Sequence, residues 1–516
     1  MPPLVETGYG PVSGTTENGV TRFLGIPYAA APGSEANRFG PPAPPEPWDQ
    51  VLEATAYGPT PPKPPIKGQL GELMPDPVIE GDDWLSVNVW TPEGEGRDPL
   101  PVMVWIHGGG FTTGSSAVTA YDGATFARDG VVCVTLNYRL GVEGFAYIEG
   151  APAPANRGLL DQVFALEWVR DNIANFGGDP DNVTLFGESA GAMSVLALMS
   201  AGVDLFHKAI VQSGTAHLGQ TVGDASLVVR AVADRLGVTP DFAGLSTVAP
   251  GDLIEAQSQV GDDVAAGADA AKYGESTIAA CGMAFMPVID GGLLSATPFE
   301  AIARGAGGNI PLLIGTTTEE FRLFVIPTPM VYWPDAEAFR ARAEVYGVPA
   351  GFYDQYAKGG TDVYPRRAPS GIACAVLTDR LVRIPTYRIA EARESGGGAA
   401  PTYVFEFGWR SPTEPNTLRV SLGACHSLEI PFVWDTLANP ESRKFTGPNP
   451  PQELAAELHS RWVEFARTGR LAGWAAYDTG DRPVMTFHRD NAPRNEVVND
   501  PRGAERKLWE GVLDPA

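Results

Sequence analysis

Short apolar runs recur along the chain, separated by longer stretches in which polar and apolar residues mix. The runs are rich in Val, Ile and Leu and show little alternation, which is typical of strands buried on both faces of a sheet. They occupy residues 102–107, 131–138, 183–186, 209–213, 311–315 and 402–407. We therefore predict a central sheet that is covered on both sides.

The segment between the second and third runs has a different period. Its apolar residues recur at spacings of three and four, which marks one face of an amphipathic helix. They are Leu159, Val163, Leu166, Val169, Ile173 and Phe176, and Gly177-Gly178-Asp179-Pro180 follows as a stop signal. Strands that alternate with helices predict an α/β fold, with a mostly parallel central sheet and helices on both faces.

Three segments interrupt this alternation. Residues 60–80 are Pro-rich and irregular, whereas residues 220–285 and 325–400 are Ala-rich with charged positions and predict helical insertions. The candidate catalytic residues described below are spread from about residue 107 to 426. We therefore expect a single domain, residues 1–516, with insertions that cap its site, although the length alone suggests about three domains.

The composition restricts the class of protein. Acidic residues outnumber basic ones by 62 to 37, which gives a formal net charge of −25 and disfavours nucleic acid as a partner. The first residues lack a basic region before an apolar core, and no apolar run reaches about 18 residues, so we expect neither a signal peptide nor a membrane span. The cysteines form no C-x-x-C pair, which predicts free thiols and a cytoplasmic location. They are Cys133, Cys281, Cys374 and Cys425.

The motif Gly187-Glu188-Ser189-Ala190-Gly191 carries the most chemical information in the chain. An apolar run, 182–186, enters it, and a helix-like run, 192–199, leaves it. This strand–turn–helix context is what a G-x-S-x-G nucleophile elbow requires, because small residues let the strand and the helix approach while the serine is held in a strained conformation. The alternative interpretation is a Gly/Ser turn without chemistry. The motifs that follow favour Ser189 as a nucleophile.

A serine nucleophile also needs hydrogen-bond donors for the oxyanion that forms on its substrate. The sequence His107-Gly108-Gly109-Gly110-Phe111 follows the apolar run at 102–106. A glycine loop that leaves a strand can turn its backbone N–H groups toward a ligand, and the usual partner is the N–H after the nucleophile, here that of Ala190.

Six histidines are available as the base. His426 lies on a loop of small residues between apolar segments and follows Ser189 late in the chain, as the order nucleophile, acid, base requires. His217 follows Ser213-Gly214 and is a candidate pocket residue. Of the other four, His207 and His459 fit structural positions, His107 belongs to the glycine loop, and His488 lies in a polar stretch.

Two adjacent carboxylates are candidates for the acid that orients the base. Glu319 and Glu320 follow the apolar run at 311–315. The carboxyl end of a strand is where an open α/β sheet places its functional groups. Composition and spacing do not choose between the two.

Together these motifs resemble type-B carboxylesterases, the α/β-hydrolase family that includes cholinesterases and bacterial p-nitrobenzyl esterases. The resemblance runs nearly end to end. Its motifs are, in chain order, Gly25-Ile26-Pro27-Tyr28-Ala29, Asn88-Val89-Trp90-Thr91-Pro92, the glycine loop at 107–111, Asn137-Tyr138-Arg139-Leu140-Gly141, Asp161-Gln162, Phe176-Gly177-Gly178-Asp179-Pro180 and the elbow at 187–191.

The resemblance implies an α/β-hydrolase fold and a role for each residue of the site, with no metal or organic cofactor. The matching positions are Ser189 (nucleophile), Glu320 (acid), His426 (base), Gly109, Gly110 and Ala190 (oxyanion hole), Ser213 (a serine beside the acid) and Glu188 (a buried glutamate of the site).

The chain departs from the family pattern at three points. The family often has Glu-Asp-Cys-Leu where this chain has Asp82-Asp83-Trp84-Leu85, and the missing cysteine favours a reducing compartment. Asp82 replaces a glutamate that pairs with an arginine, so we expect an ion pair with Arg38. Phe321 replaces the glycine after the acid, where its ring either narrows the pocket or alters the backbone.

We expect a serine esterase that hydrolyses a small-molecule ester through an acyl-serine. Phe111, Phe321, Tyr332 and Trp333 either form an aromatic-lined pocket or belong to the ordinary core. The same groups could act on carbamates or amides, and a comparison of an anilide or aryl carbamate with the matching ester discriminates these substrates. A non-catalytic binding protein on the same fold is a further alternative. The sequence leaves the choice between monomer and homodimer open.

Overall fold

A long sheet forms the centre of the molecule in the computed structural model. The structure describes residues 2–33, 37–94, 98–266, 269–327, 335–358, 368–415, 419–489 and 492–513. Within them the sheet has eleven strands, which are β3 (Thr15–Glu17), β4 (Val20–Pro27), β6 (Ser86–Pro92), β7 (Leu100–Ile106), β8 (Val132–Leu136), β9 (Gly178–Glu188), β10 (Lys208–Gln212), β13 (Leu312–Thr317), β14 (Thr402–Phe407), β15 (Pro483–Phe487) and β16 (Asn495–Asn499).

The strand order is β16-β15-β14-β13-β10-β9-β7-β8-β6-β4-β3. The seven strands from β15 to β8 are parallel, and antiparallel strands complete both edges. All six apolar runs lie in parallel strands of this sheet. The prediction of a mostly parallel sheet is therefore confirmed. Two small sheets lie outside it, one of β1 (Leu4–Glu6), β2 (Pro11–Ser13) and β5 (Leu52–Glu53) and one of β11 (Gln220–Thr221) and β12 (Val288–Ile289).

Helices cover both faces of the sheet. Successive strand residues point to opposite sides, so each strand contributes side chains to two cores. Val104 and Leu185 pack in one core cluster, whereas their neighbours Trp105 and Phe186 pack in another. The first cluster includes α3 (Gly141–Phe145), α4 (Arg157–Asn172), α5 (Ala190–Ser200), α11 (Pro298–Ala303) and α16 (Ile384–Ser395). The second includes α2 (Ala124–Arg128), α17 (Ile430–Val433), α18 (Pro440–Thr446) and α19 (Gln452–Thr468). The predicted helix at 159–176 is α4 together with a 3₁₀ turn, Ile173–Phe176, and Gly177 follows with a φ of 84°.

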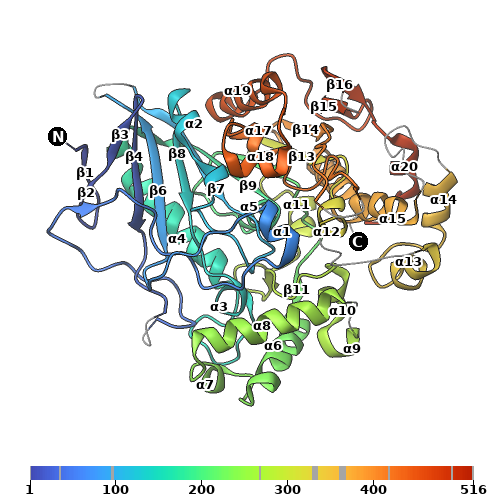
Figure 1. Cartoon of the computed structure of the whole chain (residues 1–516), viewed down its shortest axis with the longest axis horizontal. Helices are drawn as coiled ribbons and strands as arrows, with labels where there is room; N and C mark the ends of the chain where they lie inside the picture. The colour runs from blue at the N-terminus through green and yellow to red at the C-terminus, as the bar shows by residue number, and fades with distance from the viewer. Residues whose placement is uncertain are drawn as a thin grey trace.

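The segments expected as insertions carry most of the remaining helices, and those at 220–285 and 325–400 are helical as predicted. Figure 1 shows α6–α10 as a group below the sheet, with α13 and α14 at the end opposite the N-terminus. These helices are α1 (Gly68–Leu73), α6 (Val222–Leu236), α7 (Phe242–Leu245), α8 (Pro250–Ala265), α9 (Ala270–Tyr273), α10 (Glu275–Ala279), α12 (Arg322–Val325), α13 (Ala336–Ala343), α14 (Phe352–Lys358), α15 (Pro369–Thr378) and the C-terminal α20 (Gly503–Leu508).

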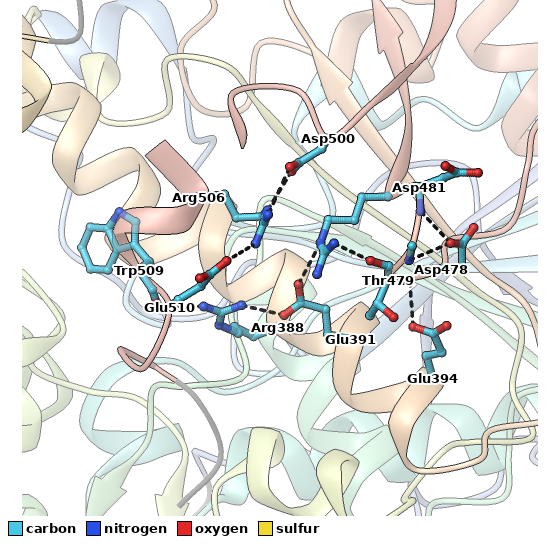
Figure 2. Close-up of polar contacts among 12 residues, drawn as sticks. Arg388, Glu391, Glu394, Asp478, Thr479, Asp481, Asp500, Arg506, Trp509 and Glu510 are labelled. Carbon is cyan, nitrogen blue, oxygen red and sulfur yellow. Dashed lines mark hydrogen bonds and ion pairs between the residues drawn. The ribbon is translucent and has the colours of Figure 1, made fainter. Parts of the chain in front are cut away.

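A hydrogen bond joins the C-terminal segment to α16, and Figure 2 shows the ion pairs within each of these two parts. Arg388 pairs with Glu391 on the same helix at 2.6 Å, and its guanidinium also donates to the carbonyl of Trp509 at 2.7 Å. Arg506 of α20 pairs with Asp500 at 2.7 Å and with Glu510 at 3.1 Å. The last helix is therefore fixed against the third insertion.

The expected ion pair between Arg38 and Asp82 is wrong. Arg38 pairs with Glu143 of α3 at 3.1 Å, and its guanidinium donates to the carbonyl of Val248 at 2.6 Å. Asp82 lies exposed at the surface. A guanidinium has five donors in a fixed fork. In Arg38 these donors are used by the carboxylate and the carbonyls that surround it, so the solvated Asp82 is not its partner.

All four cysteines are free, and Cys133 is buried in β8 as a thiol, as predicted. Among the described residues, we find no helix with the length and apolar character needed to cross a bilayer.

A buried ion pair between Arg139 and Asp161 should be a main determinant of stability. Asp161 accepts hydrogen bonds from the backbone N–H of Arg139 and from its guanidinium, at 2.7–2.9 Å, and both side chains are inaccessible to solvent. Asp161→Asn should lower the free energy of unfolding by about 3 kcal/mol or more, because the guanidinium would remain buried without its counter-charge.

Denaturant unfolding measures this loss. Asp171→Asn is the matched control, since Asp171 forms an exposed ion pair with Arg170 and its loss should change the free energy by less than about 1 kcal/mol. Equal effects of the two substitutions would contradict the prediction.

Candidate active site

Ser189 lies at the turn between β9 and α5. Its backbone has φ 56° and ψ −123°, a conformation that side-chain-bearing residues rarely adopt, and its N–H donates to the carbonyl of Gln212 at 3.0 Å. A Cβ at Gly191 would stand 2.0 Å from the carbonyl oxygen of Ile106, so only glycine fits there. This close contact holds the turn, and the half-buried Ser189 lines a cavity.

His426 and Glu320 are joined by a short hydrogen bond in the same region. Nδ1 of His426 lies 2.6 Å from Oε2 of Glu320, and because an ionised carboxylate only accepts, Nδ1 carries the proton. The other oxygen, Oε1, accepts from the hydroxyl of Ser213 and from the N–H of Thr317, both at 2.7 Å. Glu320 is therefore fully buried with both oxygens occupied, which fixes the orientation of the imidazole ring.

The structure also separates the two adjacent glutamates that the composition left open. Oε2 of Glu319 accepts from Nε of Arg410 and from the N–H of Ala424, both at 3.0 Å. Glu319 therefore supports the loop that precedes His426, whereas Glu320 contacts the imidazole itself.

The second nitrogen of the imidazole faces Glu188 and the cavity. Nε2 of His426 lies 3.0 Å from Oε1 of Glu188 but forms no hydrogen bond with it or with any other described residue. Oε1 of Glu188 instead accepts from the hydroxyl of Ser427 at 2.7 Å. Nε2 is thus available to Ser189, although the hydrogen bond between the two is not formed in this structure.

Buried carboxylates control the charge of this imidazole. Burial lowers the pKa of His426, but the charges of Glu188 and Glu320 outweigh it and raise this pKa to about 9. Burial in turn raises the pKa of Glu188 above its usual range, against the effect of His426. The cluster therefore favours the imidazolium form of His426.

Glu429 is a third carboxylate of this cluster, and the sequence analysis missed it. Its Oε1 accepts from Nε2 of Gln212 at 3.0 Å, and the amide oxygen of Gln212 accepts from the indole of Trp462 at 3.0 Å. Burial, followed by repulsion from Glu188 and Glu320, raises the pKa of Glu429 to about 8. The signal in the sequence was an acidic residue inside the apolar stretch that follows His426.

The glycine loop after β7 lies against the serine. A Cβ at Gly108 would be 3.1 Å from Cβ of Ser189, and Gly109 and Gly110 have φ of 116° and 60°. The carbonyl of Gly109 accepts from the N–H groups of Thr112 and Thr113, at 3.1 and 3.0 Å, so it is occupied within the loop. Ala190 begins α5, where backbone N–H groups have no partner inside the helix. The loop and the helix end can therefore present N–H donors beside Ser189.

The cavity that these groups share has a volume of about 670 Å³. Ser189, Glu188, Ser213, Glu320, His426, Gly109 and Gly110 all line it, and most of its other walls are apolar. The apolar residues come from the segments expected as insertions as well as from the rest of the fold, and include Leu70, Met74, Leu218, Phe285, Phe324 and Ile430.

Two of the three predicted pocket residues do not line this cavity. Phe111 is fully buried against Phe145, with ring centroids 4.6 Å apart. His217 stacks on Phe299 at 3.9 Å, its Nε2 lies 3.0 Å from the carbonyl oxygen of Leu513, and burial lowers its pKa to about 3. Both side chains turn into the core because aromatic partners are available there.

Phe321 does line the cavity, so its ring narrows the space. Its backbone has an ordinary φ of −69°, which excludes the alternative of an altered backbone. Tyr332 and Trp333, also expected near the pocket, lie outside the described residues.

Comparison with known proteins places the chain in a family. A model of the carboxylesterase family matches residues 1–509. The chain belongs to the carboxylesterase family. It is similar to para-nitrobenzyl esterase of Bacillus subtilis, with 38% identity over 98% of both chains, and to phenmedipham hydrolase of Pseudarthrobacter oxydans, with 33% identity over 96% of this chain and 97% of the relative.

Solved structures agree with this assignment. The Geobacillus stearothermophilus carboxylesterase EST55, solved at pH 6.2, covers 98% of this chain and 99% of its own with 35% identity and a TM-score of 0.82. A PNB esterase structure gives 36% identity and a TM-score of 0.80, with the same coverage. The α/β-hydrolase fold expected from the sequence is confirmed, and this carboxylesterase is a carboxylic ester hydrolase.

Glu188→Gln should lower the pKa of His426. Glutamine keeps the size of the side chain but removes the negative charge beside Nε2, so the imidazolium loses stabilisation and releases its proton at lower pH. We expect a fall of about one pH unit or more. NMR titration of ¹⁵N-labelled histidine measures it directly, since the chain has only six histidines.

The control for this titration is Glu457→Gln, which removes an exposed charge on α19 that pairs with Arg461. It should leave the His426 titration unchanged. An unchanged or higher pKa in Glu188→Gln would contradict the electrostatic account.

Proposed function

We propose that Ser189, His426 and Glu320 hydrolyse esters through an acyl-serine. His426 accepts the hydroxyl proton of Ser189 at Nε2 while Oγ attacks the ester carbonyl. Glu320 holds the imidazolium at Nδ1, and the imidazolium then gives its proton to the leaving alcohol. A water molecule, activated by the same imidazole, attacks the acyl-serine and releases the acid. The observation that carries this proposal is the 2.6 Å contact between His426 and Glu320 beside Ser189 on one cavity wall.

The oxyanion that forms on the carbonyl is proposed to accept hydrogen bonds from the N–H groups of Gly109, Gly110 and Ala190. Each such donor can contribute about 3 kcal/mol at the transition state, because the donors are fixed before the charge develops. The positive φ of Gly109 and Gly110 and the position of Ala190 at the start of α5 support this role.

The cavity supports an uncharged ester with apolar groups as the substrate. Its walls are mostly apolar, and acidic side chains outnumber basic ones among the charged residues that line it, which are Asp76, Glu188, Asp262, Glu320 and Glu441 against Lys67 and His426. An anionic substrate would meet repulsion from these carboxylates. The ring of Phe324 lies 5.3 Å from the imidazole of His426 and packs against the ring of Phe321, so these two rings limit the bulk that fits there.

Ser189→Ala should abolish hydrolysis of p-nitrophenyl esters, because alanine cannot form the acyl intermediate. The expected loss in kcat is at least about 10⁴-fold. Release of p-nitrophenol from a series of graded acyl lengths measures it, and the length profile of the unmodified enzyme sizes the acyl site.

Ser200→Ala is the matched control. Ser200 ends the same helix, and its hydroxyl donates only to the carbonyl of Ala197. This variant should keep the unmodified rate. Hydrolysis at the unmodified rate in Ser189→Ala would refute the proposal, and faster turnover of a matched anilide or aryl carbamate than of the ester would refute the ester preference.

We also propose one domain over residues 1–516 and action in the cytoplasm, as a monomer or a homodimer. The four free cysteines support a reducing compartment. The central sheet, whose strands run from residue 15 to residue 499, supports a single domain.

A single cooperative unfolding transition would support the domain assignment, and two separate transitions would contradict it. Sedimentation velocity decides the oligomeric state.

A further inference from the structure

A buried ion pair lies at the base of the first insertion, and one of its members, Asp76, also lines the cavity. Lys63 pairs with Asp76, and their side chains are 2% and 7% exposed. Burying two charges is unfavourable unless further hydrogen bonds satisfy their remaining donors and acceptors. The partners of this pair therefore show what the arrangement holds in place.

Both charges contact one residue, Gly114, which lies three residues after the glycine loop. Oδ2 of Asp76 accepts from the N–H of Gly114 at 2.8 Å, and Nζ of Lys63 donates to its carbonyl at 3.0 Å. The ion pair thus holds both backbone polar groups of a single residue.

Gly114 in turn packs on the start of the same loop. Its φ is 97°, and a Cβ there would stand 2.4 Å from the carbonyl oxygen of Gly108 and 2.6 Å from Nδ1 of His107. Between these ends, the carbonyl of Gly109 accepts from Thr112 and Thr113. Residues 108–114 form one tightly closed turn. A displacement of Gly114 therefore also displaces the backbone N–H groups of Gly109 and Gly110.

The same ion pair closes a loop that forms part of the cavity wall. Lys63 and Asp76 flank residues 64–75, which contain α1, and Leu70 and Met74 of this segment line the cavity. Figure 1 shows α1 near the centre of the molecule, between α18 and α8. On its far side, Nζ of Lys67 pairs with Asp262 of α8 at 2.7 Å, so the loop bridges the cavity between the glycine loop and the second insertion.

We propose that Lys63 and Asp76 are positioning residues for ester hydrolysis: they fix the oxyanion donors of Gly109 and Gly110 through Gly114. Neither side chain acts on the ester directly. The proposal rests on the function proposed above, since it requires an oxyanion at this position. Lys63 and Asp76 therefore differ in role from residues 64–75 between them, which shape the substrate site.

The test compares Asp76→Ala, Asp76→Asn and Lys63→Met. In Asp76→Ala the N–H of Gly114 loses its acceptor, and kcat should fall by about 10- to 100-fold, because donors misplaced by about 1 Å stabilise the oxyanion poorly. KM should stay within about threefold. Asp76→Asn should recover part of the lost kcat, since its amide oxygen can still accept from Gly114. Lys63→Met should lower kcat through the carbonyl contact and provides a second variant if Asp76→Ala does not fold.

The affinity for a trifluoromethyl ketone is measured as well, because loss of a merely structural contact would leave this affinity unchanged. This inhibitor forms a tetrahedral adduct with the serine and needs the same N–H donors, so its affinity should fall by the same factor as kcat. Titration with a fluorophosphonate counts the folded, reactive sites and corrects kcat for unfolded protein. Asp171→Ala, at an exposed ion pair with Arg170, is the matched control and should change neither quantity.

Two outcomes would overturn the proposal. One is a kcat within twofold of the unmodified enzyme in folded Asp76→Ala, and the other is a rise in KM with kcat and inhibitor affinity unchanged, which would limit the ion pair to shaping the cavity. Ser189→Ala is measured alongside, and full activity in that variant would instead refute the proposed function.

Discussion

The close contact between the first turn of α5 and the end of β7 is the constraint on which the site depends. Gly191 approaches the carbonyl of Ile106 so closely that no Cβ fits between them. This contact forces a sharp turn, and Ser189 occupies a backbone conformation that is unfavourable by about 1–3 kcal/mol. The buried packing of α5 between strands and helices sustains this strain. The serine consequently faces the cavity at the carboxyl ends of the parallel strands.

Electrostatics then assigns different roles to carboxylates that have the same chemistry. Glu188, Glu320 and Glu429 surround one imidazole, but their partners differ. Glu320 is held by Ser213 and Thr317 and contacts Nδ1, whereas burial raises the pKa of Glu188 and of Glu429. A site with three buried carboxylates can exist because the imidazolium compensates part of their charge. The same field that stabilises the imidazolium makes the neutral base the minor form at every pH below about 9.

The sequence predicted the sheet and the elbow well, because both depend on local patterns. Continuous apolar runs identify buried parallel strands, and a G-x-S-x-G motif between a strand and a helix depends on its own small residues. Contacts between residues that are far apart in the sequence were harder to predict. Arg38 was assigned the wrong partner, because its guanidinium binds Glu143, which lies 105 positions away in the sequence. Glu429 was missed, and His217 misplaced, since burial next to particular neighbours has no local signature. The choice between Glu319 and Glu320 came from resemblance and is supported by the structure only through the contact with His426.

The most direct test of the central claim is to identify the residue that becomes covalently modified. The enzyme would be treated with a fluorophosphonate until hydrolysis stops and then digested and sequenced by mass spectrometry. The account predicts one adduct per chain, on Ser189, with loss of activity in proportion to labelling. An adduct on any other residue, or complete loss of activity with Ser189 unmodified, would contradict it.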